Sequence, residues 1–351
     1  MTYNRVATPR MYMDRLSFDL ATGQRTMSNY TTIRNREIDG STVVTFVDGQ
    51  LEDLFDMRPS NYATFELENQ LFYIQIDTGQ TSDTVSEANF LAILGHNFHS
   101  SNAVFNVWHS DSANFDDTPV NVAASSGPTD VINGEADSDT NYIDPASNGW
   151  TLITWPTSES KNQYFRIYIS SDAGTTEDFL TDVKIGSIML GEYIDFPNSP
   201  DLDVGFSIDY DGSKLLTSSG GNTFAASSSL GSPAWGATNP WALEGEDTQA
   251  YKLARHYGRR RYDMNFSYVA DTNLFLSNMH AAHGAMVDGS DLYSQFYHKA
   301  LGQHMPFLFT IDKDSTDEGD YGLYRLADSE MKTKQVAHQA WNTSLSLVES
   351  W

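Results

Sequence analysis

The sequence predicts an all-β fold: two β-sandwich or jelly-roll-like domains, an extended N-terminal arm, and one helix in the C-terminal domain. Three observations favour this class. Many segments of five to eight residues are continuously apolar or alternate between apolar and polar residues. Gly, Ser, Asn and Asp separate these segments, as expected of turns. Aromatic residues make up 13% of the chain, and they suit strands. A length of 351 residues favours two domains, at roughly 100–200 residues each.

Residues 1–60 are predicted to form the arm, with short strands. Residues 41–47 (Ser-Thr-Val-Val-Thr-Phe-Val) are a β segment, and Asp48-Gly49 after them is a turn signal. Residues 51–57 favour one helical turn, which Pro59 ends.

Residues 61–195 are predicted to form a jelly roll. Six strands are expected there, at residues 62–67, 71–77, 89–94, 103–108, 163–169 and 183–190. The long acidic stretch between the fourth and fifth strands, residues 109–149, has few apolar residues and is predicted as an extended surface loop. The segment Phe196-Pro-Asn-Ser-Pro-Asp201 marks the expected domain boundary.

Residues 196–351 are predicted to form a β-rich domain with one helix. Strands are expected at residues 204–210, 261–269, 306–311 and 341–348, with a hairpin signal at Asp211-Gly212. Residues 218–232 are rich in Ser and Gly and are predicted to be mobile. Residues 291–303 have helical spacing, with Ser290 or Asp291 as N-cap.

The charge excludes several partners. A net charge of −26 repels nucleic acid and anionic lipid, and no apolar run is long enough to span a bilayer. We therefore expect no nucleic acid partner and no membrane insertion. The first residues lack the apolar segment of a secretory signal, so export by that route is not expected. The absence of cysteine removes disulfides and thiolate chemistry.

Positive charge is concentrated in two places. Residues 1–36 contain six arginines and two carboxylates, whereas residues 59–160 contain 14 acidic residues and no Lys or Arg. A second run of three arginines precedes the strand at 261–269. The arginine-rich segment beside an acidic body predicts that the arm of one copy docks on another copy. Because arginine pairs with carboxylates in a bidentate manner, the second run is predicted to contact another subunit or domain. Chance clustering on a solvated acidic surface is the alternative. The interface candidates are Arg5, Arg10, Arg15, Arg259, Arg260 and Arg261.

The sequence contains no recognisable catalytic motif. It lacks a nucleophile elbow, a P-loop and a dinucleotide fingerprint, and no cofactor is predicted. The pairs His96/His99 and His280/His283 lack further zinc ligands nearby in the sequence. An acidic segment at 312–320 gives weak calcium candidates, for which a solvated turn is the alternative: Asp312, Asp314, Asp317 and Asp320. The chain is predicted not to be an enzyme.

Three tryptophans near the acidic stretch are candidates for glycan contact, because exposed aromatic rings stack on sugars: Trp108, Trp150 and Trp155. Anchoring of the core or of loops is the alternative role for these side chains.

The first half resembles a known family. Residues 72–79 read Phe-Tyr-Ile-Gln-Ile-Asp-Thr-Gly, residues 92–97 read Ala-Ile-Leu-Gly-His-Asn, and residues 104–110 read Val-Phe-Asn-Val-Trp-His-Ser. With Tyr-Phe-Arg-Ile-Tyr-Ile at 164–169, these segments resemble the galactose-binding-like (discoidin-type) jelly roll. That resemblance implies a β-sandwich and a carbohydrate-binding module as an alternative function.

The second half is similar to bacteriophage tail proteins of the distal-tail and baseplate kind. After the expected helix come Gly-Gln-His-Met-Pro-Phe-Leu-Phe at 302–309, an aspartate-rich turn, and a final strand near residue 351. Residues 191–201 also resemble a segment of phage structural proteins. In that family the carbohydrate-type domain usually follows or lies inside the ring-forming domain, whereas here it comes first. The resemblance implies a virion structural protein, a ring or adaptor assembled in the host cytoplasm. Its partners would be its own copies, other virion proteins and host-surface glycan.

Overall fold

The computed structural model describes residues 7–24, 27, 33–37, 43–66, 71–78, 88–115, 120–122, 128–137, 141–156, 163–171, 179–210, 213–227, 258–275 and 291–350. Arg5 and the pair His280/His283 lie outside these residues. Every strand pair in the described part is antiparallel, and the all-β prediction is confirmed. The helices in the same ranges are all much shorter than a bilayer crossing requires.

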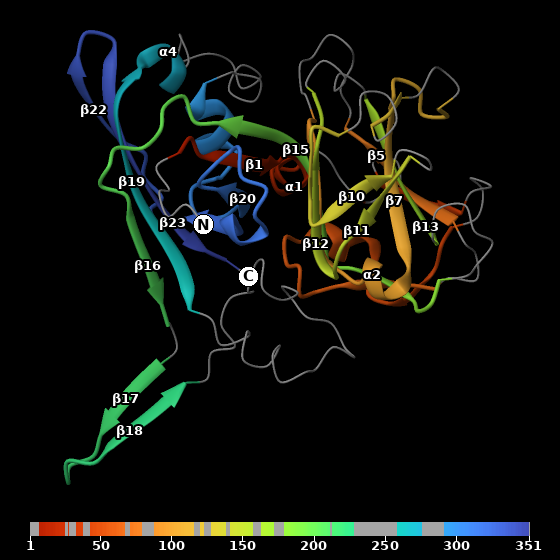
Figure 1. Cartoon of the computed structure of the whole chain (residues 1–351), viewed down its shortest axis with the longest axis horizontal. Coiled ribbons are helices and arrows are strands. Elements are labelled where there is room, and N and C mark those ends of the chain that lie inside the picture. The colour runs from red at the N-terminus through yellow and green to blue at the C-terminus, as the bar shows by residue number, and fades with distance from the viewer. Residues whose placement is uncertain are drawn as a thin grey trace.

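The largest sheet contains eleven strands of the described residues (Figure 1). Its order is β16 (Gly205–Asp209), β19 (Arg259–Ala270), β23 (Ala340–Glu349), β21 (Tyr321–Leu326), β20 (Phe307–Thr310), β1 (Arg10–Asp14), β15 (Ser187–Asp195), β6 (Phe90–His96), β12 (Gly149–Thr154) and β9 (Asp130–Ile132); β22 (Lys332–Ala337) pairs with β23.

A second sheet packs against one end of this large sheet. Its order is β10 (Gly134–Asp137), β11 (Tyr142–Pro145), β7 (Ala103–Ser110), β13 (Tyr164–Ser171), β5 (Leu71–Asp77) and β2 (Ile33–Glu37), with β8 (Val120–Asn121) beside β7. A three-stranded sheet of β14 (Val183–Ile185), β4 (Ala63–Phe65) and β3 (Phe46–Asp48) and a two-stranded sheet of β17 (Ser213–Thr217) and β18 (Thr223–Ser227) complete the strands.

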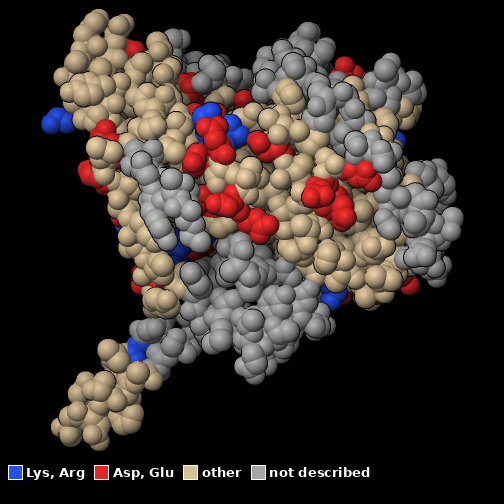
Figure 2. All heavy atoms as spheres, viewed as in Figure 1, with Lys and Arg blue, Asp and Glu red and all other residues tan. Residues whose placement is uncertain are grey.

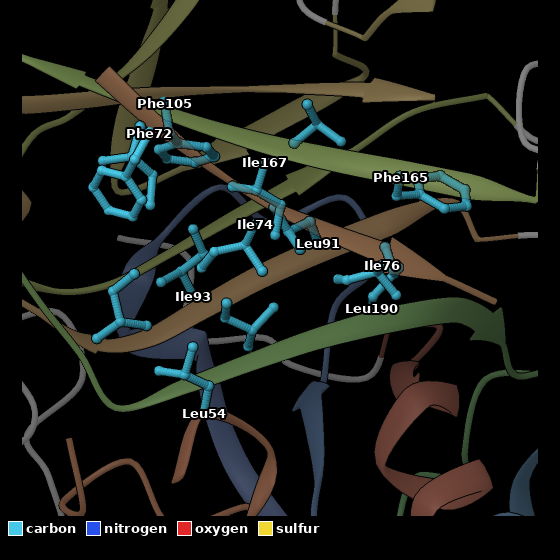
Figure 3. Packing of buried hydrophobic residues seen from close by; sticks show 14 of the residues in the cluster. Leu54, Phe72, Ile74, Ile76, Leu91, Ile93, Phe105, Phe165, Ile167 and Leu190 are labelled. Carbon is cyan, nitrogen blue, oxygen red and sulfur yellow. The ribbon is translucent and has the colours of Figure 1, made fainter. Parts of the chain in front are cut away.

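The first core is the interior of a β-sandwich (Figure 3). Ile74 on β5 and Ile167 on β13 face Leu91 and Ile93 on β6 across the two sheets. Alternate residues of β13 are buried, which agrees with the period-2 pattern of its sequence. The 3-10 helix η1 (Leu51–Phe55) lies where one helical turn was predicted, at 51–57, and it adds Leu54 to this core.

The second core lies between the far end of the large sheet and two short helices, α4 (Asp271–Leu274) and the π-helix η3 (Tyr293–His298). A helix lies within the predicted range 291–303, but it is shorter than predicted, since η3 covers only Tyr293–His298. The Asp291 carboxylate accepts a hydrogen bond from the Ser294 N–H at 3.0 Å, so it caps this helix as expected. The remaining helices are α1 (Arg15–Ala21), α2 (Phe98–Ser101) and η4 (Glu318–Asp320).

Strand β1 joins the two cores. It pairs with β15 on one side and β20 on the other, and its five residues are all buried. Met11 and Met13 enter the second core, while Tyr12 enters a third cluster with Phe90. The segment predicted to begin an extended arm is thus an interior strand in this region, and the large sheet continues across the expected boundary at 195/196.

The stretch 109–149 differs from its prediction as an extended loop. Four short strands, β8 to β11, lie within it. Ile132 and Ile143 are the buried anchors of β9 and β11. Single anchors are too few for a periodic signal, so the pattern of the sequence missed these strands.

Candidate functional site

The most distinctive surface feature is a hairpin, β17–β18, that projects from the rest of the molecule (Figure 1). The two strands pair from Ser213 with Ser227 to Thr217 with Thr223. The turn is closed by a hydrogen bond from the Gly221 N–H to the Ser218 carbonyl at 2.9 Å, and Gly221 has φ +84°, which favours glycine. Among the described strands, neither pairs with any other.

Both faces of this hairpin carry apolar side chains. Leu216 lies opposite Phe224 on one face, and Leu215 lies opposite Ala225 on the other. Leu215, Leu216 and Phe224 are 74%, 63% and 60% exposed. An isolated two-stranded hairpin is at most marginally stable in water, and exposed apolar surface of this kind marks an interaction site.

The neighbouring strand β16 extends this apolar surface. It is an outermost strand of the large sheet, pairs with β19, and exposes Phe206 and Ile208. Tyr210, which follows it, is also exposed. We call β16, Tyr210 and the hairpin together the apolar edge.

The hairpin contrasts in charge with the rest of the chain. Residues 213–227 contain one lysine and no carboxylate, in a chain with 47 acidic residues. Figure 2 shows acidic side chains gathered on the body and none on the projecting hairpin. The hairpin therefore suits contact with an acidic surface.

The sequence located this site only in part. The Ser-Ser-Gly-Gly-Asn turn between two short apolar segments is a hairpin signal, yet residues 218–232 were predicted as a mobile loop. The other expected hairpin turn, Asp211-Gly212, lies outside the described residues, and β16 before it pairs with β19.

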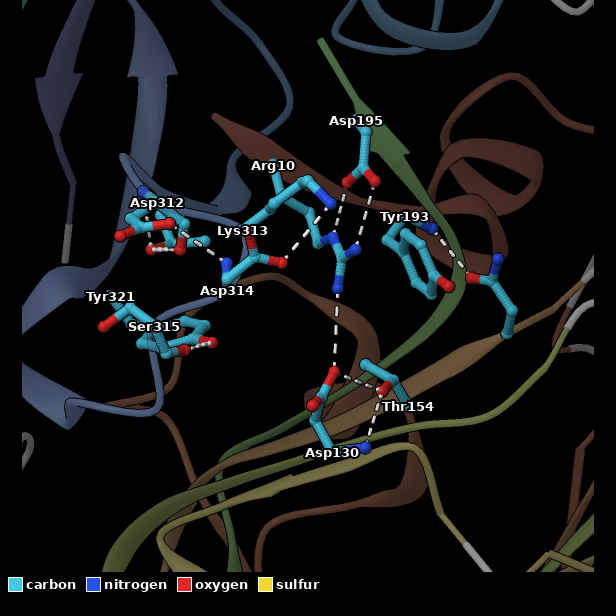
Figure 4. Close-up of polar contacts among 12 residues, drawn as sticks. Arg10, Asp130, Thr154, Tyr193, Asp195, Asp312, Lys313, Asp314, Ser315 and Tyr321 are labelled. Atoms are coloured by element: carbon cyan, nitrogen blue, oxygen red, sulfur yellow. Dashed lines mark hydrogen bonds and ion pairs between the residues drawn. The ribbon is translucent and has the colours of Figure 1, made fainter. Parts of the chain in front are cut away.

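Arg10, an interface candidate, is an interior residue (Figure 4). Its guanidinium donates to both Asp195 oxygens, at 2.5 and 3.1 Å, and lies 3.7 Å from Asp130 and 4.1 Å from the Tyr193 ring centroid. The prediction that Arg10 attaches to another chain is wrong, because β15 and β9 of its own chain supply the partners and burial removes it from the surface.

The prediction that Arg260 contacts another subunit or domain is wrong for the same reason. Its guanidinium donates to Glu349 Oε1 at 2.7 Å, and Glu349 is fully buried. Its neighbour Arg259 donates to the Glu349 carbonyl at 3.1 Å. Arg15 lies 3.7 Å from Asp19 on α1. These arginines hold their own fold together.

Arg261 differs from these residues. It pairs with Asp263 at 3.4 Å, and its side chain is half exposed. Its role as an interface residue stays a prediction.

Two of the three tryptophans are buried. Trp150 packs on Tyr321 and Trp155 on Phe165, and neither side chain reaches the surface. Their prediction as glycan contacts is wrong, because both faces of the strand that carries Trp150 are covered by other elements. Trp108 is partly exposed beside Tyr168, and its role stays a prediction.

The calcium candidates do not converge. Asp312 accepts from the Asp314 N–H at 3.1 Å, Asp320 accepts from the Ser315 hydroxyl at 2.6 Å, and Asp314 lies 3.3 Å from the Lys313 amine (Figure 4). Asp317 begins the turn into η4. Across the described ranges, no three His, Asp or Glu side chains are placed to share a metal ion.

His96 is a core residue. The ring accepts from the Phe98 N–H at Nδ1 and lies 3.0 Å from the Thr151 hydroxyl at Nε2, stacked on Phe98. Burial lowers the pKa of His96 to about 3, so the ring is neutral. His99 instead contacts the Pro145 carbonyl, so the two rings do not face a common ion.

No protein-family model matches the chain, and no curated protein matches it. Two solved structures of a carbohydrate-binding module of Clostridium perfringens, CpGH89CBM32-4, overlap with it at 12% identity. One is in complex with GlcNAc-α-1,4-galactose and covers 42% of this chain and 88% of its own (TM-score 0.27). The other, selenomethionine-labelled, covers 44% and 98% (TM-score 0.26). At these TM-scores the overlap is too small to assign a family or a function.

Proposed function

We propose that this protein is a non-catalytic structural protein that assembles through subunit interfaces, as a ring or adaptor component of a bacteriophage tail or baseplate. The observation that carries the proposal is the apolar edge, whose projecting hairpin exposes Leu215, Leu216 and Phe224. The phage setting depends on the sequence resemblance of residues 191–201 and 302–309.

The occupant of the apolar edge is a second copy of this chain. Residues 213–227 of the hairpin carry one lysine and no carboxylate, while the chain as a whole is strongly acidic. Contact between a hairpin and the body of the next copy is a heterologous interface, which generates a ring when the rotation closes. Among the described strands, β16 and β17 each have one edge without a strand partner, which allows strand addition.

The test is the mass of the full chain in solution, measured by sedimentation velocity over a concentration series. The double variant Leu216→Ser/Phe224→Ser should be monomeric where the unmodified chain is oligomeric, with an unchanged thermal transition, because both side chains are exposed. Leu202→Ser, at another exposed leucine, is the matched control and should leave the oligomer intact.

Two outcomes contradict the proposal: an unmodified chain that stays monomeric at high concentration, or an oligomer that survives the double variant. The phage setting is tested separately, by labelling purified particles that encode this sequence with antibodies against the chain. Absence of the chain from such particles would reject the setting and leave the assembly surface standing.

A further inference from the structure

A polar groove lies on the outer face of the large sheet, away from the jelly roll. It has a volume of about 440 Å³. Four pieces of chain form it: the segment before β16, and strands β19, β23 and β22. Its lining is mostly polar: Asp201, Asp203, Asn265, Phe266, Ser267, Lys332, Thr333, Lys334, Asn342, Thr343 and Ser344.

Strand register arranges these side chains in two rows. Asn265 on β19 pairs with Ser344 on β23, which pairs with Lys332 on β22. In the next row Asn342 pairs with Lys334. Alternation along β23 puts residues 342 and 344 on the same face, opposite the buried Leu345. The floor is therefore amide and hydroxyl, and one wall is basic.

The other wall is acidic and fixed in place. The Asp203 carboxylate accepts from the Asn265 amide at 2.9 Å, and the Asp201 carboxylate accepts from the Ser267 hydroxyl at 2.7 Å. The Asp201 N–H also donates to the Asn265 carbonyl at 2.8 Å, which ties this wall to β19. Each carboxylate uses one acceptor site in these bonds and has capacity for further donors.

A β-bulge places an aromatic residue beside the groove. The register of β19 with β23 shifts between Phe266 and Val269, so Ser267 and Tyr268 both lie opposite Asn342. Tyr268 has φ +59° and is 71% exposed, and its N–H donates to Asn342 Oδ1 at 3.2 Å. A positive φ is costly for a tyrosine, and bulges commonly re-aim side chains next to functional sites.

We propose that this groove binds a neutral saccharide. Sugar hydroxyls donate and accept at adjacent positions, which matches carboxylates that accept, lysines that donate, and amides that do both. The C–H face of a sugar ring packs on an exposed aromatic ring, the role of Tyr268. Nucleic acid does not fit a chain with a net charge of −26, and the neutral floor separates the two charged walls, which disfavours a compact zwitterion.

The experiment is affinity electrophoresis of the full chain in gels that contain dextran, galactan or a soluble conjugate of chito-oligosaccharides free of chitosan. Calorimetric titration follows with the sugar that retards the chain. Tyr268→Ala should weaken binding about tenfold or more, as loss of a stacked aromatic does. Tyr268→Phe keeps the ring and should bind within about twofold of the unmodified chain. Tyr210→Ala removes another exposed tyrosine, one that lies outside the groove, and should leave binding unchanged.

Three further variants separate the groove from other surfaces. Asp203→Asn should weaken binding without lowering the thermal transition, whereas Trp108→Ala, in the jelly roll, should have no effect. Leu216→Ser/Phe224→Ser should bind normally, so this inference stands or falls independently of the assembly surface. The inference is overturned if no saccharide retards the chain, if free amino acids bind in the groove instead, or if Trp108→Ala abolishes binding while Tyr268→Ala does not.

Discussion

The environment of His96 shows how burial affects a titratable side chain in this protein. His96 is fully buried, and its neutral ring is satisfied on both nitrogens. Because the Thr151 hydroxyl donates to the Asn133 carbonyl, it is free to accept from His96 Nε2–H. The proton therefore resides on Nε2, and a second proton on Nδ1 would face the Phe98 N–H, which is itself a donor.

This geometry predicts an acid-sensitive contribution to stability. The pKa of His96 is about 3 in the folded chain and about 6.5 unfolded, so the unfolded state binds more protons between these values. The contribution is present above pH 6.5 and is lost as pH falls toward 3, on the order of 5 kcal/mol in all. His96→Asn should therefore lose less stability than the unmodified chain between pH 6.5 and 4 in urea denaturation. Parallel pH profiles would contradict this assignment.

Tyr268 gives a second prediction at this scale. Asn tolerates a positive φ, so the free energy of unfolding of Tyr268→Asn should stay within about 0.5 kcal/mol of that of the unmodified chain. A β-branched residue fits this conformation poorly, so Tyr268→Val should lower the free energy of unfolding by about 1–2 kcal/mol. Urea denaturation of both variants distinguishes them. Equal stabilities would mean that the bulge relaxes when the ring is removed.

At the scale of elements, close approach between β1 and β15 depends on one glycine. A Cβ on Gly191 would lie 2.0 Å from the Met13 carbonyl oxygen and 2.8 Å from the Arg15 nitrogen. Both neighbours are backbone atoms, so no side-chain rotation relieves the clash. β15 carries this glycine where β1 ends and α1 begins.

Gly191→Ala should therefore lower the free energy of unfolding by about 2–3 kcal/mol, because the strands must separate. Gly220→Ala is the matched control: its Cβ would meet no atom closer than 3.9 Å, and stability should barely change. The measurement is urea denaturation of both variants. A Gly191→Ala variant as stable as the control would show that the strands adjust without cost.

At the scale of the whole molecule, one sheet passes through both halves. The two cores lie at opposite ends of it, and a third cluster around Tyr12, Trp150 and Leu308 fills the region between them. β1 contributes to the second and third clusters. We therefore expect the chain to unfold in a single calorimetric transition, since neither end buries its strands without the other.

Tyr12→Pro tests this coupling. Proline removes a ladder hydrogen bond from a strand that has partners on both sides, so the transition should split in two or fall markedly. Val336→Pro is the control, because Val336 lies at a register shift of β22, which pairs only with β23 among the described strands. A single, undisplaced transition in Tyr12→Pro would show that pairing through β1 does not couple the two halves.

The sequence by itself determined the strands with a regular pattern. Residues 71–77, 103–108 and 163–169 alternate or stay apolar, and β5, β7 and β13 lie there. The helical turn at 51–57 and the Asp291 cap followed from local rules in the same way. Local pattern suffices in these cases because side-chain alternation and end capping depend only on neighbours in the chain.

Only the tertiary structure decided which of these elements meet. The partner of Arg10 is Asp195, 185 residues away, and no local pattern reveals such a pair. The sequence left both a glycan-contact role and a core role open for Trp150 and Trp155, and the elements packed around them show that they are core residues. The groove joins β19, β22, β23 and the segment at 201–203, which are distant in sequence. Periodicity states that a strand has a buried face, whereas the partner that buries it is set by the packing of the whole chain.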